Sequence, residues 1–413
     1  MNVRKLVLAL AILLATISEP ASARQVDSSA SDQAADLRVF LMTMGPGAGI
    51  HERFGHNAIW IRDNRTGTDI VYNFGMFDFN APNFAWNFAR GRPLYWLEAS
   101  DLARTLAAYE YFQRRVDVQE LALDSSSKAE LAYSLAMNAL PENREYHYDY
   151  YLDNCSTRVR DALDAALGGA LRRHTMGQPA EGNLRWHTQR SISNSAPMYL
   201  GILAALGPAV DGPIDQWGEM FLPAKVQERV RELQVTDDAG RSVPLVLREA
   251  TLVDVDVHSV EPEQPDWTAR LLLIGVLLAL LVATGFLTGA AGLIGRLLAG
   301  LWGVLSGVGG LVLVFLWFFT DHVMTANNLN LLLITPVAFA ILPLLLSSRT
   351  RPIARRLTSG YFVLVCLGTV LAALRIGQEN REIAALATPI ALTATLVAMG
   401  VNRRRAEGPA QLR

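Results

Sequence analysis

The chain has 413 residues, of which 51% are hydrophobic and only 18% are charged. This composition is too apolar for a single soluble domain of ordinary makeup. The formal net charge is −2 and no basic cluster stands out, so we expect no nucleic-acid partner. The apolar excess lies at the start and in the last third, which divides the chain into a leader, a mixed domain and a membrane domain.

The leader has the features of a signal peptide. Arg4 and Lys5 precede an apolar stretch at residues 6–17, and Ala21-Ser22-Ala23 then supplies the small-x-small pattern of a cleavage site. The alternative is an uncleaved anchor helix, but the stretch is shorter than the roughly 20 residues that a membrane span needs. We therefore predict a signal peptide at 1–23 and an exported domain at 24–267.

The last third predicts five transmembrane helices over residues 268–402 and a tail at 403–413. Each apolar segment is near the length of a span; the segments are 271–291, 297–319, 329–347, 360–376 and 383–401. With the mixed domain outside, nine arginines fall in inner linkers or the tail and three in outer linkers. This split obeys the positive-inside rule, so we predict a bacterial inner-membrane protein with a periplasmic domain and a cytoplasmic C-terminus.

Two features of the membrane part stand out. Gly303-x-x-x-Gly307 predicts close helix packing in lipid. The outer loop at 319–330 collects polar residues at the membrane surface, namely Asp321, His322, Asn328 and Asn330. Two interpretations stay open for this loop: it caps helix ends, or it contacts a lipid headgroup or substrate.

The mixed domain begins with signs of a sheet. An apolar strand is expected at 39–42, and two β-type runs at 56–61 and 70–74 are joined by residues 63–69, which have hairpin chemistry. His56 would thus start a strand. Helical patterns follow at about 100–113 and 125–139.

Cys155 is the candidate nucleophile. The other cysteine, Cys366, lies in an apolar segment, so an exported domain carries one unpaired thiol. Polar residues precede Cys155, and Val159 and Leu163 follow at helical spacing, which places Cys155 at a helix start. The amides and dipole of a helix N-terminus favour the thiolate. The alternative is a small buried apolar residue without chemistry.

The base for this thiol is most readily supplied from a facing strand, and His56 fits that position. The six other histidines are His51, His147, His174, His187, His258 and His322. No pair shows the spacing of metal ligands, so we expect neither a metal site nor a cofactor.

Three segments together resemble the Lnb N-terminal periplasmic domain family. They are residues 52–58 (ERFGHNA), 71–79 (VYNFGMFDF) and 148–161 (YDYYLDNCSTRVRD). The likeness covers residues 37–165 well, and the polar loop at 319–330 is similar to that of full-length members. The order of His before Cys also resembles the permuted NlpC/P60 thiol fold of the lecithin retinol acyltransferase group. The resemblance implies an α+β periplasmic domain of permuted papain-like type, followed by the five-helix membrane domain.

The resemblance also implies a lipoprotein N-acyltransferase. Cys155 would take an acyl chain from a phospholipid as a thioester and pass it to the N-terminal amine of a lipoprotein. Asn73 is the candidate to orient His56, and Asn154 and Asp153 are expected beside the oxyanion site. Two alternatives remain: a periplasmic cysteine hydrolase acting on peptidoglycan, and a non-catalytic envelope sensor or assembly factor.

Overall fold

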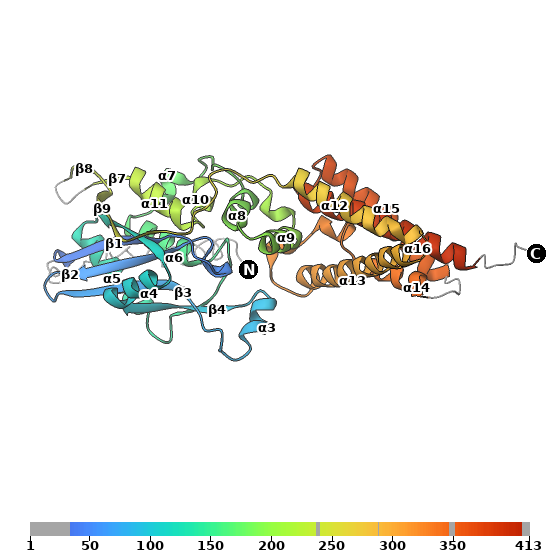
Figure 1. Cartoon of the computed structure of the whole chain (residues 1–413). Coiled ribbons are helices and arrows are strands. Elements are labelled where there is room, and N and C mark those ends of the chain that lie inside the picture. Colours follow the sequence, from blue (N-terminus) through green and yellow to red (C-terminus); the bar gives the residue numbers. More distant parts are fainter. Residues whose placement is uncertain (1–33, 237–239, 288, 347–351, 407–413) are drawn as a thin grey trace, which may run out of the picture.

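The computed structural model describes residues 34–236, 240–287, 289–346 and 352–406. The predicted signal peptide lies outside these residues. The molecule is elongated, with a sheet-containing domain at one end and the apolar helices at the other (Figure 1).

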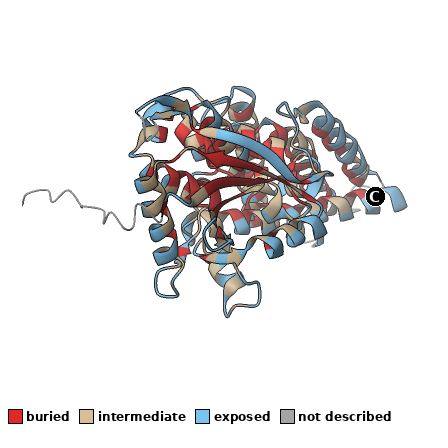
Figure 2. Cartoon of the chain, turned by 90° about the vertical axis from the view of Figure 1, so that its left-hand side faces the viewer, coloured by how far each residue is buried: buried red, intermediate tan, exposed pale blue. Residues whose placement is uncertain are grey.

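One antiparallel sheet organises the first domain. Seven strands pair in the order β6-β4-β3-β2-β1-β5-β9. Their bounds are β1 Leu37–Met44, β2 His56–Asp63, β3 Thr68–Met76, β4 Leu94–Asp101, β5 Arg114–Leu121, β6 Glu145–His147 and β9 Val246–Asp256. The central strands are buried on both faces (Figure 2), which explains why β1 is a continuous apolar run and not an alternating one. A separate hairpin joins β7 (Gln234–Thr236) and β8 (Ser242–Pro244).

Helices cover both faces of the sheet. α4 (Leu102–Tyr111) packs on the face that carries Phe40, Met42 and Trp60. α5 (Ser125–Asn138), α6 (Cys155–Ala166) and α11 (Pro223–Glu232) pack on the opposite face. The remaining helices are α3 Phe84–Ala89, α7 Ala170–Thr175, α8 Leu184–Ile192, α9 Ala196–Ala205 and α10 Gln216–Glu219, with 3₁₀ turns η1 Ile50–Glu52 and η2 Pro208–Val210.

The local predictions in this domain are largely confirmed. β2 begins at His56, and β2 and β3 form the expected hairpin, closing at Asp63 opposite Thr68. The helix predicted from residue 100 begins instead at Leu102, because β4 runs to Asp101, whose side chain accepts from the Arg104 amide as the N-cap. Strands β4, β5, β6 and β9 were not predicted.

The five predicted spans are confirmed as apolar helical segments long enough to cross a membrane. The first span consists of α12 Thr268–Ala283 and η3 Thr284–Phe286, and the second is α13 Ala290–Phe318. The third, which follows the short η4 Val323–Thr325, consists of η5 Leu329–Leu332, η6 Pro336–Ala340 and α14 Ile341–Leu346. The fourth is α15 Pro352–Ala373 and the fifth is α16 Arg381–Ala406. The third span is a broken helix, because Pro336 cannot continue the hydrogen-bond ladder. α16 is the central helix and packs against α12, α13, α14 and α15.

Close packing at the small-residue motif is confirmed. A side chain on Gly303 would lie 3.1 Å from the Ala338 carbonyl oxygen, and one on Gly307 would lie 2.7 Å from the Phe339 ring. The same face of α13 continues to Gly310, where an added Cβ would lie 2.4 Å from Thr335 Cα. Glycine therefore lets the broken third span lie directly against α13.

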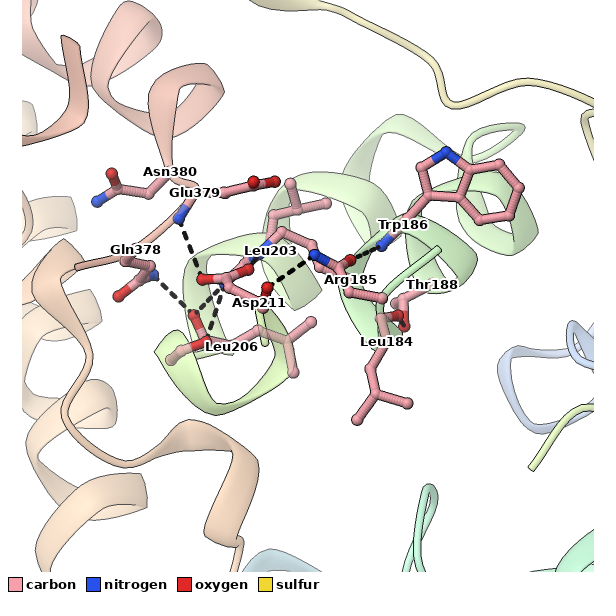
Figure 3. A network of polar contacts seen from close by, with 12 residues as sticks. Leu184, Arg185, Trp186, Thr188, Leu203, Leu206, Asp211, Gln378, Glu379 and Asn380 are labelled. Atoms are coloured by element: carbon pink, nitrogen blue, oxygen red, sulfur yellow. Dashed lines mark hydrogen bonds and ion pairs between the residues drawn. The ribbon is translucent and has the colours of Figure 1, made fainter. Parts of the chain in front are cut away.

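Buried polar side chains join the two domains. The Asn328 amide donates to the carbonyls of Ala204 and Ala205 at 2.8 and 2.9 Å, at the C-terminal end of α9. Gln378 donates to the Leu206 carbonyl at 2.9 Å, and beside it Asp211 accepts from the Glu379 amide (Figure 3). These bonds satisfy carbonyls that the end of α9 leaves unpaired, which fixes the soluble domain on the membrane helices.

Replacing Asn328 with leucine tests this joint. The variant removes the donor of the Ala205 carbonyl and one of the two donors of the Ala204 carbonyl, which costs about 2 kcal/mol. We expect a lower thermal unfolding midpoint in detergent. The matching change at exposed Asn80 is the control and leaves the midpoint unchanged. Equal midpoints for both variants would contradict this role of Asn328.

Candidate active site

Cys155 is the first residue of α6, as predicted, and its position is set by the residue before it. The Asn154 side-chain oxygen accepts from the amides of Ser156 and Thr157 at 2.8 and 2.9 Å. Asn154 thus caps two of the first amides of α6 and leaves the Cys155 amide for another acceptor. The cysteine itself is buried, with 8% of its surface exposed.

The start of α6 lies where β2 and β3 separate. Pairing between these strands extends from Asp63 only to Ile59 opposite Tyr72, and β3 then bulges between Asn73 and Met76. Within the bulge, Gly75 has a φ of +86°, and a side chain there would lie 3.3 Å from Cys155 Cβ. A glycine is required because it supplies both the left-handed backbone and the space for the cysteine.

His56 and its neighbour bind the thiol from the β2 side. Burial by itself would raise the pKa of Cys155. The charge of His56 and its hydrogen bond oppose this, together with the Asn57 backbone N–H and the Ser156 hydroxyl, and lower the pKa to about 7. A substantial share of Cys155 is therefore thiolate near neutral pH, beside an imidazole that can take its proton, which makes Cys155 a strong candidate nucleophile.

The pH dependence of alkylation tests this pairing. Because only the thiolate reacts, alkylation of Cys155 should slow as the pH falls through about 7. His56→Ala removes the largest of the contributions that lower the pKa of Cys155 and keeps the burial that raises it. The midpoint should move to at least the ordinary value, so alkylation at pH 7 should be about a hundredfold slower. The pH midpoint is measured from iodoacetamide kinetics in a Cys366→Ser background. A midpoint that His56→Ala leaves unchanged would show that His56 does not set the pKa of the thiol.

A cavity of about 650 Å³ surrounds the pair and has two chemically different ends. Toward α4 its wall is mixed, with the polar side chains of Asn73, Ser100 and Thr105 beside Ala108 and Phe112. Toward the membrane domain the wall is mostly apolar; its residues include Phe88, Ile202, Leu206, Leu316, Val323 and Met324. Since Leu316 belongs to α13, one continuous cavity joins the thiol to a membrane-spanning helix.

The remaining residues predicted at the centre of the site lie around it. Asn73 lines the cavity with His56, and its amide donates to the Ser100 hydroxyl at 3.1 Å. Both Asn154 amide hydrogens are donated to carbonyls, of Tyr150 at 2.8 Å and Phe221 at 2.9 Å. Asn154 therefore acts by fixing Cys155 and has no N–H left for an oxyanion. Asp153 forms an ion pair with Arg158 outside the cavity wall.

The predicted outer-loop residues separate into two pairs. Asn328 and Asn330 are buried and donate to carbonyls at the end of α9, which is the capping role. Asp321 pairs with Arg92, and His322 lies against the Phe88 carbonyl at 3.1 Å and lines the cavity. The structure thus brings His322 to the cavity of Cys155 and leaves the two asparagines away from it.

Three contributors to the site were not predicted: the Asn57 backbone N–H, the Ser156 hydroxyl and Gly75. Ser156 Oγ lies 3.9 Å from the sulfur. A backbone donor carries no sequence signal, but Gly75 stands in an otherwise strand-like run, which is a known sign of a bulge or a close approach. Within the described part of the chain, no three His, Cys, Asp or Glu side chains group as metal ligands.

Comparison with known families gives two matches. The Lnb N-terminal periplasmic domain matches residues 24–194, and the Lnb transmembrane domain matches residues 264–404. The first includes both His56 and Cys155, and the second includes all five spans. No curated protein and no solved structure matches the chain.

Proposed function

The chain belongs to the Lnb family and is an inner-membrane protein with a periplasmic N-terminal domain, and from this we propose that it is a thiol acyltransferase. It moves a fatty acyl chain from a phospholipid, through a thioester on Cys155, to the N-terminal amine of a lipoprotein. The observation that carries the proposal is the buried thiol of lowered pKa in a cavity that continues onto a membrane helix. A thiol placed there can meet a substrate that never leaves the bilayer.

In the first step, the Cys155 thiolate attacks the ester carbonyl of the phospholipid. The C–O bond breaks, the acyl group stays on sulfur, and His56 gives the proton taken from the thiol to the departing lysophospholipid oxygen. The Cys155 backbone N–H, which Asn154 leaves uncapped, is our candidate donor to the oxyanion.

In the second step, the amine of the acceptor attacks the thioester carbonyl. The C–S bond breaks, an amide forms, and the amine proton returns through His56 to the sulfur. Amide formation from a thioester runs downhill, so no further cofactor is needed for this chemistry. Asn73 remains our candidate for orienting His56, since both residues line the cavity.

The two ends of the cavity suit the two substrates. The apolar end toward α13 fits the acyl chain, because an apolar wall lets the chain pass from the bilayer into the cavity without exposure to water. The end toward α4, where Asn73, Ser100 and Thr105 form a hydrogen-bonded chain, offers polar groups to the peptide end of the acceptor. This arrangement would keep the two substrates on opposite sides of Cys155.

Mass spectrometry of lipoprotein N-termini tests the function. The full chain is produced in cells depleted of their own lipoprotein N-acylation, beside a Cys155→Ala variant. We expect an amide-linked acyl chain only with the wild type. If the wild type adds none, the acyltransferase proposal fails. Release of muropeptides from purified cell wall by the same protein would instead favour the hydrolase alternative.

A further inference from the structure

We propose that the connection between β3 and β4, residues 77–93, inserts into the outer-leaflet surface of the membrane and forms the opening through which a phospholipid acyl chain reaches the cavity. This connection includes α3 and projects from the sheet on the side of the membrane helices (Figure 1). The identity of the lipid as acyl donor rests on the proposed function. The insertion of the connection into the membrane surface does not depend on that function.

The connection contacts the membrane domain just beyond the end of α13. The Asp321 amide donates to the Arg90 carbonyl at 2.9 Å, Asp321 also pairs with Arg92, and His322 contacts the Phe88 carbonyl. Residues 321 and 322 lie three and four residues after Phe318, where α13 ends. The connection therefore lies at the depth where this span leaves the hydrocarbon.

Glycine makes the contact tight. Gly91 has a φ of +74°, and a side chain there would lie 2.8 Å from the backbone nitrogen of His322. Only glycine combines this backbone with so close an approach. The attachment of the connection to the end of α13 is thus built into the backbone of both segments.

Aromatic side chains are exposed on both sides of this attachment. In the connection Phe79 is 66% and Trp86 is 56% exposed, and on the span Phe318 and Phe319 are similarly exposed. The Trp86 ring lies 6.3 Å from that of Phe315 in α13, so the two sets are continuous. Trp rings gather at the level of lipid headgroups, and exposed Trp and Phe of interfacial segments bury at the boundary with the acyl chains, which identifies the bilayer surface as the partner that covers them.

The cavity reaches this aromatic surface. Phe88 of α3, Leu316 of α13 and Val323 of the outer loop line it, together with Cys155 and His56. An ester bond lies near the headgroups while its acyl chain lies deeper. A lipid at this opening can therefore present its ester to the thiol without leaving the membrane.

Fluorescence quenching tests the insertion without any turnover. The full chain is reconstituted in phosphatidylcholine vesicles whose acyl chains are brominated near the headgroup, and emission is compared with unbrominated vesicles. We expect the emission lost in Trp86→Phe to be strongly quenched by bromine in the wild type. The matched variant Trp217→Phe, at a buried tryptophan of the soluble domain, should remove only unquenched emission. Trp86 emission that bromine leaves unchanged would overturn the proposal. It would mean that a second copy of the chain or another protein covers Trp86 in place of lipid.

Transfer from vesicles gives the second readout. Trp86→Ser should lower the rate of acyl transfer from vesicle phospholipid about tenfold. Tyr133→Ser, at a 67% exposed aromatic on α5 far from the membrane helices, should leave that rate unchanged. Alkylation of Cys155 at the wild-type rate verifies that each variant is folded. If vesicles are never a donor but Trp86 is quenched, the proposed acyl donor fails and the inserted connection stands.

Discussion

Replacing Cys155 with alanine should lower acyl transfer about a thousandfold or more, the largest effect expected in this protein. The reason is that both steps pass through the sulfur, and no neighbouring side chain can form the thioester in its place. Cys155→Ser is a sharper variant, because a hydroxyl has nearly the same shape but is far harder to ionise than a thiol whose pKa is about 7. We expect it to be almost as inactive as the alanine variant.

The acyl-enzyme provides the direct measurement. Wild-type protein incubated with phospholipid and no acceptor should gain the mass of one acyl group, and hydroxylamine should release it as expected for a thioester. His56→Ala should accumulate it about a hundredfold more slowly, since the base that activates the thiol is gone. Cys366→Ser, in the membrane helix α15, is the matched control and should acylate at the wild-type rate. Acylation that survives in Cys155→Ala would place the chemistry elsewhere.

The placement of Cys155 and His56 could be predicted because both depend on local signals. A polar cap followed by apolar residues at helical spacing marks the start of α6, and two β-type runs around a turn mark the hairpin that begins at His56. The contact between these two elements could not be predicted in the same way. Their contact requires β2 and β3 to separate beyond Ile59. Gly75 marks a possible bulge in the sequence, but only the folded sheet shows where the strands separate and that α6 begins there.

Some parts of the fold that were not predicted depend on partners distant in sequence. β5 pairs with β9, more than a hundred residues later, and neither run stands out alone. Asn154 was assigned to the oxyanion site because an amide near a nucleophile fits that role. One of the two carbonyls to which its side chain actually donates, that of Phe221, lies 67 residues away. Likewise, only the docking of α9 explains why Asn328 and Asn330 are buried.

Replacing Asn154 with alanine should have the largest effect on stability among single changes at the site. The side chain makes four hydrogen bonds while only 4% exposed: it accepts from Ser156 and Thr157 and donates to Tyr150 and Phe221. Loss of the cap alone costs about 1 kcal/mol. The Phe221 carbonyl, left buried without this donor, raises the total to about 3 kcal/mol of unfolding free energy.

Reactivity should fall with stability, because Cys155 is the residue that this cap positions. In Asn154→Ala we expect alkylation of Cys155 at pH 7 to slow about tenfold. Asn154→Ser separates the two roles, since a hydroxyl can still accept from the helix amides but cannot reach both carbonyls. It should recover the alkylation rate more than the unfolding midpoint.

Asp124→Ala is the matched control, since Asp124 caps α5 through one hydrogen bond of 2.7 Å to the Ser127 amide. It should lose about 1 kcal/mol of stability and leave the reactivity of Cys155 unchanged. If Asn154→Ala matched this control in both measurements, α6 would hold its nucleophile without the cap. A larger loss in both would mean that the residue before the cysteine couples the fold of the domain to its chemistry.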